Sequence, residues 1–314
     1  MNASQIPGGT VFSTEPFLGA WRDNHAPNSR LLSLEVATDR GEGTVHGLVH
    51  ERGDRTVAAD FGPDGLFACP WPLASPGRGA KPLLQSMAAH RVSLLTWHVR
   101  FDHHWLAPLL EQSGASHQEQ ETHVLRLPES HDLAFAGYKK TRRTEIRACH
   151  ARGVTIRPAR HHDEIDAYCR LHEKLEAAKN FRVRYPAKLI HALLALPNVA
   201  TLLIAEVNDQ VIAGAFFIRD GDCLMYWHGA ADRDFASYVP SGALVDRGIQ
   251  LAIAEGMRTV NFGASTSDSL RGFKESFGAE PAQNRTFQLT ARVSRVKRYY
   301  WALKGLVKGR GGQT

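Results

Sequence analysis

The fold is decided by residues 199–229, which read VATLLIAEVNDQVIAGAFFIRDGDCLMYWHG. Three apolar runs are separated here by two turn signals, ND at 208–209 and DGD at 220–222. Short polar loops of this kind join antiparallel neighbours in a sheet. The pattern therefore predicts a three-stranded antiparallel ribbon at residues 199–207, 210–219 and 223–229.

Helical patterns flank this ribbon on both sides. Residues 133–151 form a basic helical stretch that stops at Gly153, and residues 164–179 gather apolar side chains on one face. Alternating helices and strands of this kind predict an α/β protein with layers of helix on sheet. Further elements are expected at 154–158 (strand), 187–196 (helix), 241–255 (helix) and 259–263 (strand).

The first 127 residues repeat this organisation with weaker patterns. Glycine-containing turn signals at 41–43 and 53–54 separate β-like runs and predict an antiparallel meander. The segment 66–80 is rich in Pro and Gly, which favours a surface loop. Strands are predicted at 31–36, 44–50, 56–59, 91–99 and 122–127, and helices at 15–23, 81–90 and 105–112.

Length and composition narrow the class of protein. The chain has 314 residues, of which 43% are hydrophobic and 22% charged, so disordered and collagen-like proteins are excluded. The length predicts two domains of ordinary size. A net charge of +6 favours anionic partners without identifying one.

Cysteines, histidines and apolar runs indicate the compartment. The 4 cysteines lack the short paired spacings of a disulfide framework, so reduced thiols are expected. No signal-peptide pattern begins the chain and no apolar run is long enough to span a membrane, so a cytoplasmic location is expected. The 16 histidines do not have metal-ligand spacing, and no metal is expected.

Several blocks in the second half resemble a known family. The run YKKTRRTEIR at 138–147, followed by GVT at 153–155, resembles the basic helix of the FemAB-type branch of the GNAT acyltransferase superfamily. The blocks that follow are similar to the family in order and spacing, and the resemblance covers roughly residues 130–285. These blocks are LIAEV (203–207), VIAGAFF (211–217), YWHGAA (226–231), NFGAS (261–265), LRGFK (270–274) and FGAEP (277–281).

The resemblance implies two GNAT-like α/β domains in tandem, each a mostly antiparallel sheet flanked by helices. Residues 1–128 would be a diverged first domain, residues 129–290 the catalytic domain, and residues 291–314 a basic C-terminal segment. It also implies transfer of an acyl or aminoacyl group, from acyl-CoA or aminoacyl-tRNA, to a primary amine. The acceptor would be a small-molecule or lipid-linked precursor of the cell envelope, a polysaccharide or a metabolite.

Acyl transfer to an amine develops an oxyanion, which a nearby positive charge stabilises. By resemblance, Lys274 is the lysine of the family's Phe-Lys pair that stabilises this transition state, and Phe273 positions it. Without the family resemblance, a solvated charge pair of Lys274 and Glu275 on a helix surface is the favoured interpretation. The general base is left open among His228, Asp232, Asp268 and Glu275.

His228 is the second catalytic candidate. Alternation along its strand predicts Met225 and Trp227 on one face, with Tyr226 and His228 on the other. His228 could also be a packed, hydrogen-bonded strand residue. Substrate contacts are further predicted at Trp227, Tyr238 and Ser265.

The start of the helix at 241–255 bears on the donor. Relatives that use acyl-CoA hold its pyrophosphate on a Gln/Arg-x-x-Gly-x-Gly/Ala loop before a helix. This chain offers only Ser241, Gly242 and Ala243 there, with a single glycine. Such a departure is typical of a FemAB-type enzyme that uses aminoacyl-tRNA, although Pro240 and Ser241 also suit an ordinary helix start.

Basic side chains supply the remaining candidates. Arg142, Arg143 and Arg147 could bind phosphates, since Arg143 and Arg147 are one helical turn apart, or could simply be a solvated helix face. In a non-catalytic alternative, a GNAT-like module would bind RNA, such as tRNA, or lipid phosphates through these residues. Residues 291–314 could contact the inner face of an anionic membrane, or pack on the second domain.

Overall fold

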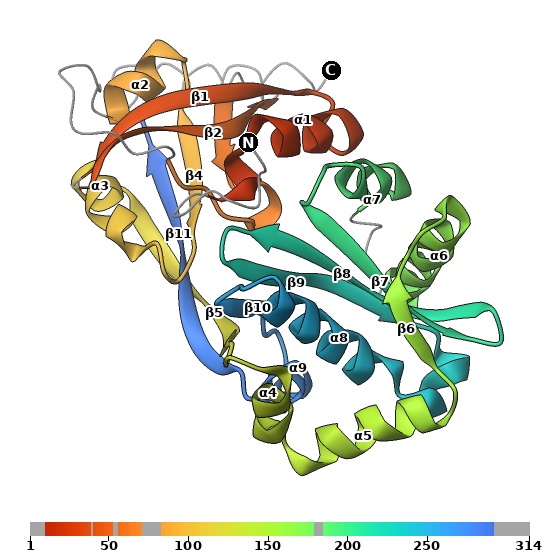
Figure 1. Ribbon diagram of the computed structural model, residues 1–314. Coiled ribbons are helices and arrows are strands. Elements are labelled where there is room, and N and C mark those ends of the chain that lie inside the picture. The colour runs from red at the N-terminus through yellow and green to blue at the C-terminus, as the bar shows by residue number, and fades with distance from the viewer. Residues whose placement is uncertain (1–9, 39, 53–55, 71–82, 179–184, 292–314) are drawn as a thin grey trace, which may run out of the picture.

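The protein is described by a computed structural model that covers residues 10–38, 40–52, 56–70, 83–178 and 185–291. Within these residues, one sheet has the strand order β1-β2-β3-β4-β11-β5-β10-β9-β8-β7-β6. Helices cover both of its faces (Figure 1). The arrangement confirms the predicted α/β fold, in which helices flank a mostly antiparallel sheet.

The first part of the sheet is the predicted meander. Strands β1, β2 and β3 are antiparallel neighbours, and β3 then runs parallel to β4. Their apolar side chains form one core, in which Trp97 is fully buried. The elements here are α1 (Glu15–Asn24), β1 (Ser29–Thr38), β2 (Gly41–Arg52), β3 (Thr56–Phe61), α2 (Leu83–Ala89), β4 (Leu94–Val99) and α3 (Ala107–Gln112).

The second part contains the antiparallel ribbon that the sequence predicts. Asn208 and Asp209 adopt φ values of 49° and 60°, as a tight two-residue hairpin turn requires. The elements are β6 (Thr155–Pro158), α6 (His162–Ala178), α7 (Ala187–Leu194), β7 (Ala200–Val207), β8 (Gln210–Asp220), β9 (Cys223–Ala231), α8 (Pro240–Ala254), β10 (Thr259–Ala264) and α9 (Asp268–Glu275).

Helices approach β8 closely from both faces. A Cβ atom on Gly214 of β8 would lie 2.4 Å from the Tyr168 ring of α6. On the opposite face, a Cβ atom on Gly248 of α8 would lie 2.4 Å from the Phe217 ring of β8. Because neither glycine has a side chain, α6 and α8 can both pack directly on the ribbon.

The centre of the sheet combines strands from distant parts of the chain. Strand β11 (Glu280–Thr290) is antiparallel to β4 on one side and to β5 (Ser116–Arg126) on the other. A strand from the end of the described chain thus lies between two strands of the first part. The sheet is continuous across residue 128, and the domain boundary expected there stays a prediction.

The predicted helix at 133–151 is instead two helices, α4 (His131–Gly137) and α5 (Lys140–Ala151). The backbone is extended at Tyr138, with φ −67° and ψ 149°. Tyr138 is buried, and its hydroxyl donates a hydrogen bond of 3.0 Å to Asp246 of α8. Burial of this aromatic side chain therefore interrupts a pattern that reads as one helix.

The predicted surface loop at 66–80 is wrong for residues 66–70, which are buried. The carbonyl of Ala68 accepts a 2.9 Å hydrogen bond from the Trp97 indole, and that of Cys69 accepts one from Ser13. Burial of the apolar side chains of Leu66 and Phe67 stabilises the fold. This effect outweighs the preference of the neighbouring Pro and Gly residues for a surface loop. Residues 71–82 lie outside the described part of the chain.

A buried ion pair joins the two parts of the sheet. Arg100, which follows β4, is 3% exposed, and Asp220, which ends β8, is 1% exposed. The Arg100 guanidinium donates to the Asp220 carboxylate at 2.5 Å, and the same carboxylate accepts from Val11 N at 2.8 Å. Arg100 also contacts Asp102 at 2.6 Å. The pair fixes the N-terminal segment, β4 and β8 relative to one another.

Replacing Asp220 by Asn should lower the free energy of unfolding by about 3 kcal/mol, because Arg100 loses its buried counter-ion. This loss of stability lies at the low end of the range for broken buried ion pairs, because Asp102 still contacts Arg100. Urea unfolding measures it. Asp23→Asn, which removes an exposed ion pair with Arg22, is the matched control and should lower the free energy of unfolding far less, because water screens this pair. Equal losses for both variants would contradict the assignment.

Stability should also fall in acid, because burial lowers the pKa of His98 and of His103 to about 4. Unfolded histidines take up protons near pH 6.5, so the unfolded state is favoured as the pH falls from 6.5 towards 4. Each residue should contribute on the order of 3 kcal/mol across this window. In urea unfolding, His103→Gln should flatten the dependence on pH, whereas the exposed control His90→Gln should not.

Candidate functional site

The candidate site lies where two parallel strands part. Strands β9 and β10 pair at three positions, the last being Asn261 with Met225. Beyond this point β9 continues to pair with β8, and β10 continues to pair with β5. Both of these ladders contain a register shift. We call residues 227–229 and 262–265 the strand fork. In α/β folds, ligands bind at the carboxyl ends of strands where neighbouring connections diverge.

Lys274 reaches the fork from α9. Ser267 caps this helix by accepting a hydrogen bond from Leu270 N at 3.3 Å. Lys274 is only 4% exposed, and its Nζ donates to the carbonyls of Gly263 and Ala264, each at 2.6 Å. Successive carbonyls of a regular strand point in opposite directions. Gly263, at φ +70° within the register shift, allows both to face the same ammonium.

Near pH 8, Lys274 is present in both its protonated and its neutral form. Burial lowers the pKa of Lys274 to about 8, an effect that the negative charge of Glu121 opposes. An ammonium has three N–H donors. Two are used by the carbonyls of β10, and no third acceptor is recorded among the described residues. One donor therefore remains for a ligand at the fork.

Strand β5 adds a histidine that the sequence did not single out. His123 is 0% exposed, and its Nδ1 lies 2.9 Å from the hydroxyl of Ser265, which follows β10. Its Nε2 lies 4.0 Å from the carboxylate of Glu275. His123 precedes Ser265 by 142 residues, and only the pairing of β5 with β10 brings them together. No local pattern could have indicated this contact.

His228 lies on the other arm of the fork, but on a different face from the one predicted. A register shift between Phe216 and Phe217 places His228 and Trp227 on the same face of β9, against α6. The His228 Nδ1 is hydrogen-bonded to the hydroxyl of Tyr168. Burial, together with His172, holds the pKa of His228 well below its usual range. A bulge therefore broke the alternation on which the prediction rested.

The three arginines of the basic helix do not converge on one ligand. Arg143 donates to the carbonyls of Ala136 and Tyr138, between α4 and α5. The Arg147 guanidinium lies 5.3 Å from the centre of the Phe135 ring. Both are thus engaged by the chain itself, and the expected pairing of Arg143 with Arg147 around a phosphate has no counterpart in these contacts.

Arg142 is buried between α5, α8 and α9. Its guanidinium lies 4.6 Å from the ring centre of Phe273 and 4.8 Å from that of Phe277. It also donates to Ser276 Oγ at 2.9 Å and pairs with Glu145 at 2.7 Å. Phe273 is therefore packed by an arginine, and this stack holds α9, with Lys274, against the second part of the sheet.

The first turn of α8 is crowded and lacks one backbone donor. Pro240 at its first position has no N–H to donate. A Cβ on Gly242 would lie 2.6 Å from Arg142, so the space beside this turn already holds a side chain. Ser241 also belongs to this turn, whereas Tyr238 ends the preceding short helix and contacts Phe235. The substrate contacts expected of Ser241, Gly242 and Tyr238 stay predictions.

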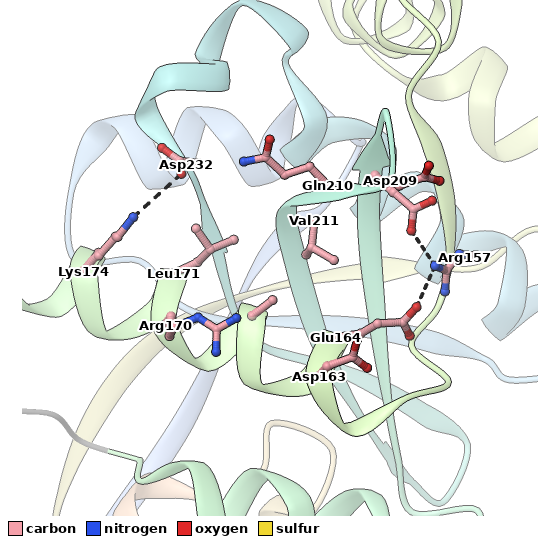
Figure 2. Close-up of a pocket in the computed structure, with 12 residues that line it drawn as sticks. Arg157, Asp163, Glu164, Arg170, Leu171, Lys174, Asp209, Gln210, Val211 and Asp232 are labelled. Atoms are coloured by element: carbon pink, nitrogen blue, oxygen red, sulfur yellow. Dashed lines mark hydrogen bonds and ion pairs between the residues drawn. The ribbon is translucent and has the colours of Figure 1, made fainter.

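A separate pocket of about 610 Å³ lies between α6 and the β7–β8 hairpin (Figure 2). Arg157 there binds Glu164 and Glu206, and Lys174 lies 4.0 Å from Asp232. Of the candidates for a general base, only Asp232 lines this pocket. Asp268 instead pairs with Arg271 at 2.7 Å. The pocket is therefore distinct from the strand fork.

The described residues contain neither a metal-binding cluster nor a helix that could span a membrane. No group of three or more His, Cys, Asp or Glu side chains could hold a metal ion there. None of the described helices is both long and apolar enough to cross a membrane. Of the predicted basic segment 291–314, all but residue 291 lies outside the described part of the chain.

Comparisons with known proteins agree with this architecture. Residues 136–275 match the family model described as the acetyltransferase (GNAT) domain. A search of curated proteins gave no match. Among solved structures, FemX superposes with a TM-score of 0.69 at 13% identity, covering 92% of this chain and 94% of FemX.

Two further structures share the fold. L-PGS from Bacillus licheniformis has a TM-score of 0.56 at 10% identity, covering 96% of this chain and 98% of L-PGS. A tandem GNAT protein from the clavulanic acid biosynthesis pathway has a TM-score of 0.50 at 14% identity, covering 90% and 89%. Residues 136–275 therefore resemble the GNAT acetyltransferase domain, in a chain that shares the fold of FemX.

Proposed function

We propose that the protein is an N-acyltransferase that moves an acyl or aminoacyl group to a primary amine at the strand fork. The observation that carries this proposal is the buried ammonium of Lys274. Two of its N–H groups are fixed by the carbonyls of Gly263 and Ala264, which orients the third. Such a preorganised donor suits an oxyanion that forms only in the transition state.

The reaction begins when the amine attacks the carbonyl carbon of the donor. Negative charge then collects on the carbonyl oxygen, and Lys274 stabilises it by hydrogen bonding in a site shielded from water. Phe273 acts indirectly, since its stack with Arg142 keeps α9 in place. The structural relatives named as FemX and L-PGS support an acceptor from the cell envelope.

An aminoacyl-tRNA donor is favoured by the first turn of α8. Pro240 removes one amide donor, and Arg142 fills the space beside Gly242. A donor that does not place a pyrophosphate on this turn would not meet either obstacle. The basic surface of α5, where Lys139 and Lys140 are exposed, supports an anionic donor of this kind.

The two donors can be separated directly. The purified protein should transfer the aminoacyl group of aminoacyl-tRNA to an amine, and ribonuclease should abolish this activity. Acetyl-CoA should be a far poorer donor, because α8 lacks the cradle for its pyrophosphate. Transfer from acetyl-CoA at an equal or greater rate, measured as thiol release, would overturn the preference for tRNA.

Replacing Lys274 by Met should reduce kcat by about 10²-fold or more, with a smaller effect on KM for the amine, because the lost interaction belongs to the transition state. Steady-state kinetics with the active donor measure both constants. A comparable kcat for variant and wild type would end the assignment of Lys274.

Lys274→Arg is the matched control for charge. In the wild type, kcat should fall as the pH rises through about 8, because Lys274 then loses its proton. Arginine stays charged in this range, so any activity that Lys274→Arg retains should lack this fall. An unchanged alkaline limb in this variant would assign the titration to another group.

A further inference from the structure

We propose that Ser265, His123 and Glu275 form a proton relay that removes a proton from the acceptor amine at the strand fork. The inference rests on the proposed N-acyltransferase function and adds the groups that move the proton. An aliphatic amine is protonated at neutral pH and becomes a nucleophile only after losing that proton. Lys274, as an ammonium, cannot accept it.

The geometry orders the three groups. The Ser265 hydroxyl lies 2.9 Å from His123 Nδ1, and Glu275 Oε1 lies 4.0 Å from His123 Nε2. Glu275 is too far away for a hydrogen bond, but its negative charge favours the tautomer that carries the ring proton on Nε2. The other nitrogen, Nδ1, then accepts the hydrogen bond from Ser265. Within the described residues, Nε2 is buried and has no hydrogen-bond partner.

Exposure decides which member meets the substrate. Ser265 is partly exposed and directly follows Ala264, whose carbonyl binds Lys274. His123 is 0% exposed, so it can act only through the serine hydroxyl. Ser265 is therefore the catalytic member of the relay, whereas His123 and Glu275 are positioning residues.

Proton removal precedes acyl transfer. The ammonium of the acceptor gives one proton to Ser265 Oγ while the proton of the Ser265 hydroxyl passes to His123 Nδ1, which leaves a neutral amine and an imidazolium. The amine nitrogen then forms a bond to the carbonyl carbon. As the bond from carbon to the leaving group breaks, a second proton passes from the nitrogen to the leaving group. The products are an amide and the protonated leaving group, and the proton on His123 returns to water through Ser265.

The charges around His123 suit a temporary proton acceptor. Burial lowers its pKa, and the positive charges of Lys274 and Arg271 act in the same direction, so the ring is neutral before reaction. Glu121 of β5 and Glu275 of α9 act in the opposite direction. Their carboxylates favour the imidazolium that forms during transfer.

The test compares two amines in the wild type, His123→Gln and Ser265→Ala. Methylamine is protonated at neutral pH, whereas hydroxylamine is not. With methylamine at pH 7, each variant should lose about 10²-fold in kcat, which is typical of a lost general base. With hydroxylamine the loss should stay below threefold. The methylamine defect should also shrink as the pH rises.

The matched control is His98→Gln. His98 is a half-buried histidine, and its Nδ1 lies 2.9 Å from the hydroxyl of Thr286. It belongs to β4, which two strands separate from β10. His98→Gln should treat the two amines alike. In the wild type, imidazole ¹⁵N shifts should show the proton of His123 on Nε2.

The outcomes distinguish a failure of the proton relay from a failure of the proposed N-acyltransferase function. Equal losses with both amines, or a ring proton on Nδ1, would overturn the relay alone. An active wild type with unaltered His123→Gln and Ser265→Ala would do the same. A wild type that transfers to neither amine, from aminoacyl-tRNA or acetyl-CoA, would overturn the proposed function and the relay together.

Discussion

Strand β11 is the constraint on which the rest of the structure depends. It is hydrogen-bonded to β4 along one edge and to β5 along the other, so the sheet is continuous only while β11 lies between them. The strand follows α9 directly, and the segment between them is held by Lys139 N, which donates to the Ser276 carbonyl at 2.9 Å. The register of β11 thus sets the position of α9, and α9 carries Lys274 to β10.

Burying an ammonium is unfavourable, and the strand fork explains how this fold tolerates one. Where β9 and β10 part, backbone carbonyls lose the partners that a regular ladder supplies, and a buried carbonyl without a partner is itself destabilising. Lys274 satisfies two of these carbonyls at once. The same two hydrogen bonds therefore reduce both the cost of burying the ammonium and the cost of burying the carbonyls. The divergence of strands that creates the site also supplies the hydrogen bonds that fix its charged group.

The sequence predicted what depends on local patterns. The ribbon at 199–229 was found because its turns and apolar runs are contiguous, and Lys274 was found because a family resemblance marks it. His123 was missed because its partners lie far away in the chain and meet it only through strand pairing. The prediction of which face of β9 carries His228 was wrong, because a one-residue bulge is not visible in a period-two pattern.

Arginines near an active site are not necessarily ligands for phosphate. A phosphate-binding arginine needs donors that the protein leaves unused. Arg142, by contrast, donates to Ser276 and Glu145 and lies against two aromatic rings. Its positive charge lies beside the first turn of α8, where the helix dipole is also positive, so Glu145 is needed to balance it. The contacts of Arg142 therefore hold α9 against α5, and they use the donors that a phosphate would need.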